Sequence, residues 1–488
     1  MKRIIYSIVA IIICVCVVSC SNNDSFTTSP SALLTFTADT LRLDTVISGQ
    51  LSATKHIVVR NRGGKGVRIA AVSIVGDDAD QYQVVADGTT ISPSAPAEAF
   101  PIEVRSHDSI SAYVRLRPTK ASEPRPRPVN AAIVFTLQSG QTQTITLDGW
   151  AQDVVELSTA TIAADTTLTP AAGPFHITRE LTIAAGATLT LLPGVELLFA
   201  PGAGLRVEGT LTAQGTLAEP ITLRGDRLDY MFPLQPYDRI PGQWGGVTFT
   251  STSYGNTLNF CNIHSGSYGL RCDSTDTAVE KLRLENSVVH NMKGDCLTLV
   301  ASRAFVGNCQ LTNALGNCVT LRGGDAHFVH CTIGNFYPFE GNRGKALYLY
   351  NSLNGRRLPL TQALFENSIV SGWSDDELFA AFLDDTSTAH NYLFRSCLLT
   401  TPEPTAAEDL ANFPACVFEN TADTLWGSKN FRDFNYDTLV FDFRLDSLSP
   451  ARRGGDAAIA RQYYPYDRRG IARPAAAPSV GCYQYEGE

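Results

Sequence analysis

The chain has 488 residues, of which 44% are hydrophobic and 18% are charged. Its 39 basic residues against 48 acidic ones give a formal net charge of −9, which argues against a nucleic-acid partner because such a partner calls for a basic surface. Beyond the first twenty residues, no stretch is long and apolar enough to predict a membrane-spanning helix.

Residues 1–19 are predicted to be an export signal. Lys2 and Arg3 precede an apolar run, Ile4–Val18, that is too short for a comfortable membrane span. The run ends in a phrase, Val-Val-Ser-Cys, that resembles a bacterial lipobox, which implies lipidation (palmitate) of Cys20. We therefore expect a lipoprotein of the outer membrane, on the cell surface or in the periplasmic leaflet. A cleaved signal peptide or an N-terminal anchor helix is the alternative.

Residues 20–33, rich in Ser, Thr, Asn and Pro, are predicted to form a flexible tether. From residue 34 to 153, short alternating strands such as Lys55–Val59 are separated by turn formers such as Asn61–Gly64. About 120 residues of this kind predict a β-sandwich.

The order of phrases in this segment resembles the Hydin-like, major-sperm-protein-like immunoglobulin family. A strand ends in Asn61-Arg62-Gly63, an aromatic-centred strand surrounds Tyr82, and a later strand runs into Pro118. The resemblance implies an immunoglobulin-like fold that serves as a spacer or binding module and brings no catalytic residues.

Similar short phrases recur through residues 154–488. Their small central residues lie at positions 261, 287, 309, 331, 368 and 397, and the two shortest steps between them are 22 residues. Glycines punctuate strands of three to five residues from Leu181 to Leu223. Such a period without a helical pattern predicts a solenoid of stacked strands.

The phrases around Gly186–Val195, Gly209–Ile221 and Gln243–Phe249 resemble right-handed parallel β-helix proteins of the pectin-lyase-like superfamily. The segment from about residue 440 looks like the C-terminal cap of exported bacterial β-helix proteins, in which Asp456, Asp467 and Arg473 would form hydrogen bonds. The whole chain then resembles the surface lipoproteins of Bacteroidetes-type bacteria. The fold class expected is all-β, an immunoglobulin-like β-sandwich followed by a right-handed parallel β-helix.

Nine cysteines remain beyond Cys20, an odd number that cannot all pair within the chain. Four of them share one repeat position with Ser287 and Ser368, which predicts small buried residues with free thiols. One thiol per coil also does not suit a metal site, so neither a metal nor a cofactor is expected.

Enzymes are common in the superfamily that the chain resembles, but their signatures are missing. The paired-Asp, His-Gly and Arg-x-Lys phrases of polygalacturonase-type hydrolases do not occur, nor does a convincing pectate-lyase pattern. The repeat positions instead carry Asn286, Asn308, His330, Glu366 and Asn367, which we interpret as a corner ladder of internal hydrogen bonds.

Four insertions interrupt the period, and loops on a rigid scaffold are where function concentrates. They span 226–243, 335–345, 351–362 and 372–390. The ligand-binding candidates on them are Tyr230, Tyr237, Arg343, Lys345, Arg356, Arg357 and Trp373. The catalytic candidates, all in the last insertion, are Asp375, Asp376, Glu377, Asp384, Asp385 and His390.

Three functions fit these features. The leading hypothesis is a non-catalytic outer-membrane lipoprotein that binds a glycan (carbohydrate binding) or a protein partner through loops of the β-helix. The second is a polysaccharide lyase or glycoside hydrolase that uses the fourth insertion. The third is an accessory subunit of an outer-membrane complex.

Overall fold

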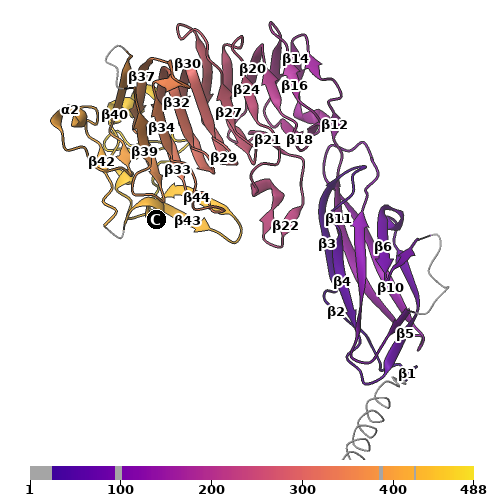
Figure 1. Cartoon of the computed structure of the whole chain (residues 1–488). Coiled ribbons are helices and arrows are strands. Elements are labelled where there is room, and N and C mark those ends of the chain that lie inside the picture. The colour runs from indigo at the N-terminus through magenta and orange to yellow at the C-terminus, as the bar shows by residue number, and fades with distance from the viewer. Residues whose placement is uncertain (1–24, 94–101, 384–387, 423–424, 488) are drawn as a thin grey trace, which may run out of the picture. The chain divides into compact units, whose positions relative to one another are not determined.

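The computed structural model describes residues 25–93, 102–383, 388–422 and 425–487. The predicted signal peptide and Cys20 lie outside the described residues. The chain is all-β and divides into two compact units, drawn in Figure 1. The first unit runs to Ala121 and includes Pro126–Gln152, and the second holds Ser122–Arg125 and continues from Asp153. In the described ranges no helix has the length and apolarity needed to cross a membrane.

The first unit consists of two sheets that share one buried core. Buried and exposed side chains alternate along its strands, as along Ser109–Leu116, because each sheet has one face in the core. One sheet has the order β1 (Phe26–Thr27), β5 (Gly66–Val75), β10 (Arg127–Leu137), β11 (Thr142–Gln152) and β3 (Thr40–Ile47), with β8 (Ile102–Val104) beside β5. The other has the order β2 (Thr35–Phe36), β4 (Lys55–Arg60), β9 (Ser109–Leu116), β6 (Tyr82–Ala86) and β7 (Thr89–Ile91).

The first unit begins before residue 34, the start of the predicted sandwich. Phe26 and Thr27 of β1 pair in parallel with Gly66 and Val67 of β5. The Phe26 ring lies so close to Gly66 that an added Cβ would come within 2.6 Å of it. The Arg68 guanidinium lies 4.1 Å from the centre of the same ring. Part of the predicted tether is therefore a strand, because Phe26 has a surface to pack on.

The second unit is a column of stacked coils in which successive coils pair in parallel. Leu197 pairs with Leu223, Leu223 with Ile263, and Ile263 with Val289, so each coil places an apolar residue above that of the coil before. Large parallel sheets wound from short strands are the architecture of a β-helix. The predicted all-β class with a parallel β-helix is confirmed at this level.

The column has three faces. Face 1 contains β12 (Val155–Glu156), β15 (Phe175–Ile177), β18 (Glu196–Phe199), β21 (Ile221–Gly225), β26 (Cys261–His264), β29 (Val288–Met292), β31 (Gln310–Ala314), β33 (Thr332–Asn335), β38 (Ile369–Gly372), β41 (Leu398–Leu399) and β42 (Val417–Phe418). Face 2 contains β13 (Thr161–Ile162), β16 (Leu181–Ile183), β19 (Leu205–Val207), β24 (Val247–Phe249), β27 (Leu270–Cys272), β34 (Leu347–Tyr350) and β39 (Leu378–Ala381). Face 3 contains β14 (Thr166–Leu168), β17 (Thr188–Leu191), β20 (Thr210–Gln214), β25 (Asn256–Asn259), β28 (Glu280–Glu285), β37 (Leu360–Glu366) and β40 (His390–Arg395). The long strands β30 (Leu297–Gly307) and β32 (Val319–Val329) belong to faces 2 and 3 together.

Seven of the cysteines lie in the buried interior of the column, and four of these share the stacked position that their spacing predicts. The nine cysteines of the described residues are unpaired, and eight are buried. Backbone N–H of Cys261 donates to Ser287 Oγ at 2.9 Å, and Ser287 N–H faces Cys309 Sγ at 3.4 Å. Both Ser and Cys can therefore fill the position, because the side chain of each accepts a hydrogen bond from a backbone N–H of the neighbouring coil. Burial raises the pKa of the Cys261 thiol to about 12, which keeps it protonated.

The predicted corner ladder follows face 3, and its Asn residues are explained by the backbone. Asn286, Asn308 and Asn367 have φ values of 49°, 56° and 47°, a left-handed region that Asn tolerates better than most residues. Asn308 Nδ2 donates to Asn286 Oδ1 at 2.8 Å, and Asn367 Nδ2 lies 3.0 Å from His330 Nε2. The interpretation of these residues as internal hydrogen-bonding groups is confirmed.

The C-terminal segment runs back along this corner of the column. Tyr464 bonds Glu285, Arg473 donates to Asn308, and Tyr483 donates to Gln310. The segment therefore covers the side of the column at these coils, instead of only closing its last coil as expected. Its elements are η5 (Gly427–Asn430), β43 (Phe431–Asn435), β44 (Val440–Leu445), η6 (Pro450–Arg452) and α3 (Ala457–Tyr463).

The cap residues named from the sequence bond as predicted. Asp456 Oδ1 accepts from the N–H of Ala458 at 2.7 Å, so it caps the start of α3. Asp467 accepts three backbone N–H groups of the same segment. Arg473 donates to the carbonyls of Ser479 and Gly481.

Candidate functional site

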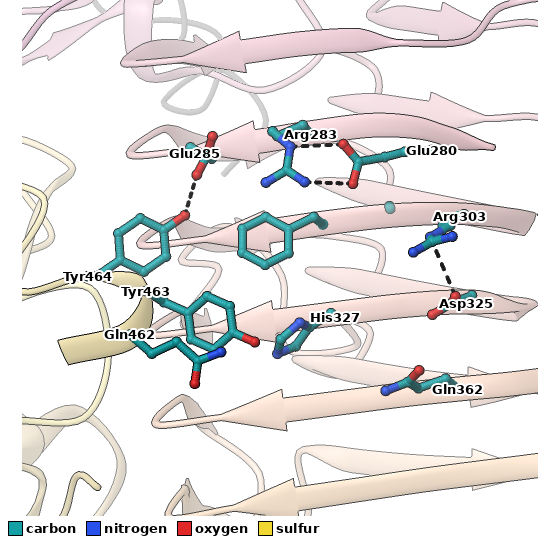
Figure 2. A pocket seen from close by; sticks show the side chains of 12 residues that line it. Glu280, Arg283, Glu285, Arg303, Asp325, His327, Gln362, Gln462, Tyr463 and Tyr464 are labelled. Atoms are coloured by element: carbon teal, nitrogen blue, oxygen red, sulfur yellow. Dashed lines mark hydrogen bonds and ion pairs between the residues drawn. The ribbon is translucent and has the colours of Figure 1, made fainter. Parts of the chain in front are cut away.

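Face 3 and helix α3 enclose a cavity of about 400 Å³, which we name the α3 pocket. Figure 2 shows the strands of face 3 supplying one wall and the end of the helix supplying the other. Its lining residues are Glu280, Arg283, Glu285, Arg303, Ala304, Phe305, Asp325, His327, Gln362, Gln462, Tyr463 and Tyr464.

The register of the column places these side chains in rows. Glu280 of β28 pairs with Arg303 of β30, which pairs with Asp325 of β32. In the neighbouring row, two residues further along each strand, Phe305 of β30 lies beside His327 of β32. Parallel strands lie about 4.8 Å apart, so each row presents polar or aromatic groups at that interval. A repeating scaffold therefore creates the wall of the pocket.

The charged groups of the first row and Arg283 of the neighbouring row neutralise one another. Arg283 donates from two nitrogens to the two carboxylate oxygens of Glu280, each at 2.8 Å. Arg303 Nε lies 3.6 Å from Asp325 Oδ2, a longer ion pair. Both pairs are partly exposed, so they add little to stability but hold their planar groups at the cavity wall.

His327 lines the cavity next to Tyr463 (Figure 2). Its Nε2 lies 2.9 Å from Glu366 Oε2, and Arg395 donates to the other oxygen of that carboxylate at 2.8 Å. The imidazole meets the rings of Phe305 and Tyr463 edge to face, with centroids 5.3 and 5.4 Å away. Three neighbours, Glu366, Phe305 and Tyr463, hold this ring in one orientation.

Helix α3 is fixed to face 3 by Tyr464. Its hydroxyl donates to Glu285 Oε1 at 2.6 Å. Burial, reinforced by this carboxylate, raises the pKa of Tyr464 far above its usual range, so the phenol stays protonated. The ring lies over Gly307, where an added Cβ would come within 2.0 Å of the hydroxyl oxygen. The pocket therefore depends on a glycine at this position of β30.

Two of the acidic residues in the pocket wall, Glu280 and Asp325, are separated by an arginine. A glycosidase places two carboxyl groups on opposite sides of a scissile bond. Glu280 and Asp325 are two strands apart, about 9.6 Å between backbones, but Arg303 lies in the row between them.

In the described ranges no group of three or more His, Cys, Asp or Glu side chains is placed to hold a metal ion.

The candidates of the first insertion lie on a projecting hairpin of β22 (Tyr230–Phe232) and β23 (Gln235–Pro236), followed by η4 (Tyr237–Arg239). Tyr230 is exposed there. Tyr237 is covered by the Arg227 guanidinium, 3.8 Å from its ring centre. Neither tyrosine lines the α3 pocket.

Arg343 and Glu377 belong to the interior instead of an exposed loop. Arg343 Nη2 donates to Glu377 Oε1 at 2.6 Å, and both side chains are buried. The same carboxylate accepts the backbone N–H groups of Ala346 and Ser374. Lys345 Nζ donates to the carbonyl of Asp376 at 2.6 Å. These contacts tie two insertions together, and a buried ion pair of this kind is costly to break.

The remaining candidates are dispersed. Arg356 and Arg357 form the exposed strand β36, which pairs with β35 (Ser352–Leu353). Asp375 is exposed, and His390 stacks on Phe382 with ring centres 4.9 Å apart. Trp373 lines a second cavity, of about 740 Å³, beside the hairpin of β43 and β44. Asp384 and Asp385 lie outside the described residues. The structure does not bring the candidates into one site.

Sequence reasoning missed the α3 pocket. Arg283, Phe305 and His327 occupy one position of the repeat, and an alignment of the coils on their small central residues would have placed them in one row. The other wall had no such signal. Tyr463 and Tyr464 come from a helix more than 130 residues further along the chain, and no repeat pattern connects them to face 3.

Comparisons with known proteins give no family. No family model matches the chain. A stretch of 72 residues is 35% identical to "Protein bark beetle" of Drosophila melanogaster, which is 15% of this chain and 2% of that protein. The chain therefore matches only a small part of the length of this curated relative.

Similarity to solved structures is weak. The catalytic unit of the thermostable GH87 α-1,3-glucanase from Streptomyces thermodiastaticus strain HF3-3 is 11% identical, covers 70% of this chain and 73% of its own, and has a TM-score of 0.28. A family 123 glycoside hydrolase from Clostridium perfringens covers 25% of this chain and 30% of its own at 9% identity and a TM-score of 0.17. The ASH / PapD-like domain of human CEP192 covers 26% of this chain and 91% of its own at 13% identity and a TM-score of 0.18. Likenesses at this level carry no argument about activity.

Proposed function

We propose that the protein binds an uncharged oligosaccharide in the α3 pocket. The observation that carries this proposal is the pairing of charges in the cavity wall: Glu280 with Arg283, and Arg303 with Asp325. Paired guanidinium and carboxylate groups offer donors and acceptors side by side, which is what vicinal sugar hydroxyls bind. Phe305 and Tyr463 also line the cavity and add apolar surface to it.

The balance of charge favours an uncharged ligand over an acidic one. The lining holds three carboxylates, Glu280, Glu285 and Asp325, and two guanidinium groups, Arg283 and Arg303. An acidic polysaccharide would meet a wall that has no excess positive charge to receive it. A neutral glycan loses less solvation on entry and needs no counter-charge.

The setting that we propose for this site is the outer membrane. A lipid on Cys20 would hold the protein there, and the first unit, an immunoglobulin-like spacer in this proposal, would separate the β-helix from the membrane. A right-handed winding of the column belongs to the same proposal. The lipobox-like phrase supports the lipid anchor, and the order of the predicted strands in residues 34–153 supports the immunoglobulin-like spacer.

A glycan array followed by calorimetry on the mature chain tests the proposal. We expect neutral oligosaccharides to bind and Arg303→Ala to weaken binding about tenfold, since a charge-assisted hydrogen bond contributes on the order of 1.5–3 kcal/mol. The matched control is Arg206→Ala, another half-exposed arginine of the column with a glutamate at 2.9 Å, which should leave binding unchanged. Equal affinity of wild type and Arg303→Ala, or no glycan bound at all, would contradict the proposal.

A polysaccharide lyase or hydrolase is the second candidate. The observation in its favour is that His327 and Tyr463, two groups able to transfer protons, face the same cavity. Release of unsaturated or new reducing ends from polysaccharides, lost in His327→Ala, would establish this activity and displace the binding-only function. The same assay with Asp375→Ala and His390→Ala tests the fourth insertion.

A further inference from the structure

The hairpin of β22 and β23 ends in an uncharged apolar segment, residues 230–234, which we name the apolar tip. Its exposed apolar side chains, 41–59% exposed, are Tyr230, Met231, Phe232 and Leu234. The sequence has no charged residue from 230 to 237. Single exposed apolar residues are normal on a protein surface, but four within five residues mark a surface that a partner covers.

The base of this hairpin is fixed to the column. Asp238 Oδ1 lies 2.6 Å from His264 Nε2 and 2.9 Å from Arg224 Nε, both on face 1. Asn291 Nδ2 donates to the carbonyl of Arg239 at 3.1 Å. The tip is therefore presented from a rigid base, and such preorganisation lowers the entropy cost of binding a partner.

The cavity beside Trp373 offers an apolar surface without net charge. Its exposed apolar side chains, 43–60% exposed, are Trp373, Leu425, Tyr436 and Leu448. Its charged side chains, two cations and two carboxylates, are Lys429, Arg432, Asp433 and Asp446. The formal charges cancel, so the cavity suits an apolar ligand without charge, which is the chemistry of the tip.

The tip and the cavity lie on the same side of the column, where Figure 1 shows β22 and the hairpin of β43 and β44. Arg239 Nη1 donates at 2.7 Å to the carbonyl of Thr438, in the turn between β43 and β44. Along face 1, β21 before the tip and β38 before Trp373 are five strand steps apart, about 24 Å. Among the described residues, none of the tip lines the cavity of its own chain.

We infer that the protein forms a twofold-symmetric dimer in which the apolar tip of each copy enters the cavity beside Trp373 of the other. Both surfaces lie on one side of one chain, so a twofold rotation that places one tip over the partner's cavity also places the second tip over the second cavity. Aromatic side chains bury about 150–250 Å² each, so the exposed parts of the tip and the cavity offer several hundred Å² per copy. A stable interface buries roughly 800 Å² on each partner, which is the same order.

A lipid bilayer is the other environment that could cover the apolar tip. Insertion deep enough to cover the cavity as well would remove water from Lys429, Arg432 and the carboxylates beside them, at a large cost in free energy. Shallower insertion would leave the matching cavity open. The observations therefore favour a second copy of the chain over a membrane.

The inference is separate from the proposed glycan site. Among the described residues, none that lines the α3 pocket belongs to the tip or lines the cavity beside Trp373. Failure of the dimer would therefore leave the glycan proposal standing, and failure of glycan binding would leave the dimer standing.

Sedimentation equilibrium of the mature chain, with Cys20→Ala to remove the proposed lipid, tests the inference. We expect an equilibrium between monomer and dimer. Leu234→Asp in the tip should raise the dimer dissociation constant about a hundredfold or more, because a twofold interface contains the substitution twice and each buried unpaired carboxylate weakens binding about tenfold. Leu448→Lys in the cavity should have a similar effect. Both leucines are exposed in the single chain, so neither substitution disturbs the fold.

A mixture of the two variants gives the sharpest test. Each variant alone has no intact contact between a tip and a cavity. A mixed dimer has one, formed by the tip of the Leu448→Lys chain and the cavity of the Leu234→Asp chain, and its other contact brings opposite charges together. The mixture should therefore associate at concentrations where each variant alone is monomeric.

The matched control is Leu217→Asp. Leu217 is a 50% exposed leucine of the column that belongs neither to the tip nor to the cavity lining. Its substitution adds the same charge and should leave the dissociation constant unchanged.

The outcomes are distinct. Association of the mixture, but of neither variant alone, would establish the interface. A wild-type chain that stays monomeric at about 100 μM would overturn it, and so would a dimer that both substitutions leave intact. Loss of the dimer in only one variant, or in both without recovery in the mixture, would overturn the pairing of tip with cavity. Flotation of a monomer with phosphatidylethanolamine–phosphatidylglycerol vesicles, abolished by Leu234→Asp, would assign the tip to lipid and overturn the dimer.

Discussion

The two units bury similar apolar side chains, but they arrange them by different rules. In the first unit, antiparallel strands alternate, and residues from two sheets meet across one closed core. In the second, each coil repeats the coil before, so Phe328, Phe365 and Phe394 stack with ring centres 4.7 and 4.6 Å apart. Repetition inside the column implies repetition outside it, which is how Glu280, Arg303 and Asp325 come into one row.

The difference teaches where each unit can carry a site. A sandwich face changes its side chains from strand to strand, so a site there must be built residue by residue. A stacked face repeats its positions at the strand spacing, and a covering segment such as α3 turns a flat row into a pocket. Substitutions that affect one unit and spare the other test this contrast.

The largest expected effect comes from removing a core ring. Phe365→Ala in the column and Phe135→Ala in the sandwich should each lower the free energy of unfolding by about 3–5 kcal/mol, because both rings are fully buried. Denaturant unfolding should show each change in the transition of its own unit only. Phe232→Ala, on an exposed ring, is the control. One common transition shifted by both substitutions would mean that the units unfold together.

A smaller effect is expected at buried asparagines. In the sandwich, Asn61 Nδ2 donates to three backbone carbonyls, including that of Val104 at 3.0 Å. In the column, Asn367 combines hydrogen bonds to the backbone of Asp456 with a φ of 47°. Asn61→Ala and Asn367→Ala should each cost about 1–3 kcal/mol of unfolding free energy.

Substitution by glycine separates the loss of the hydrogen bonds from the strain of a left-handed backbone at these positions. Asn367→Gly should recover part of the loss, since glycine accepts the left-handed backbone, whereas Asn61→Gly should recover nothing. Equal recovery of unfolding free energy at both positions would show that the left-handed backbone at Asn367 does not contribute to the cost of Asn367→Ala.

A pH dependence should appear in the column and not in the sandwich. His176 is buried between Glu156 Oε1 at 2.8 Å and Asp226 Oδ2 at 3.1 Å. Burial, the largest influence, lowers its pKa, but the hydrogen bonds from the imidazole to Asp226 and Glu156 outweigh it and raise the pKa above the usual value. A raised pKa in the folded state stabilises the fold below the unfolded-state value of about 6.5, and this stabilisation is lost as the pH rises through the folded-state value.

We therefore expect His176→Gln to destabilise the second unit most near pH 6 and progressively less at higher pH. The first unit exposes both of its histidines, His56 and His107, so its transition should show no such change. A wild-type advantage over His176→Gln that grows as the pH rises would refute the assignment. Unfolding monitored at a series of pH values measures it.

The smallest effect is expected for a sulfur-to-oxygen exchange. Cys309→Ser should change unfolding free energy by less than about 1 kcal/mol, because Ser287 and Ser368 already make the required bonds in the same stack. Ala112→Ser puts a hydroxyl into the sandwich core, where no ladder receives it, and should cost about 1–3 kcal/mol. Equal costs at the two positions would show that the stack has no special tolerance for a small polar atom.

Much of the fold could be predicted from the sequence. The 22-residue steps between Ser287, Cys309 and Cys331 indicated the stack, and the Cys and Ser interchange indicated its buried position. The Asn residues of the corner indicated a ladder of internal hydrogen bonds. These features are local or periodic, and a period survives in the chain itself because every coil must satisfy the same neighbours.

The insertions were harder to interpret. Their charged residues predicted exposed loops, yet Arg343 and Glu377 form a buried ion pair. Composition cannot reveal such a pair, because the two residues are far apart in the chain and become neighbours only after folding. A charged residue is expected to be exposed unless the fold places an oppositely charged partner beside it.

The sequence by itself determined the repeat, the stacked interior and the division of the chain into one unit of alternating strands and one unit of repeating strands. Only the tertiary structure decided where the sites lie. The α3 pocket needs the C-terminal helix to return to coils formed more than 130 residues earlier, and the cavity beside Trp373 needs the hairpin of β43 and β44 to fold against a distant corner. The physical reason is that a period records contacts between neighbouring coils, whereas a cavity between distant segments leaves no regular mark on the chain.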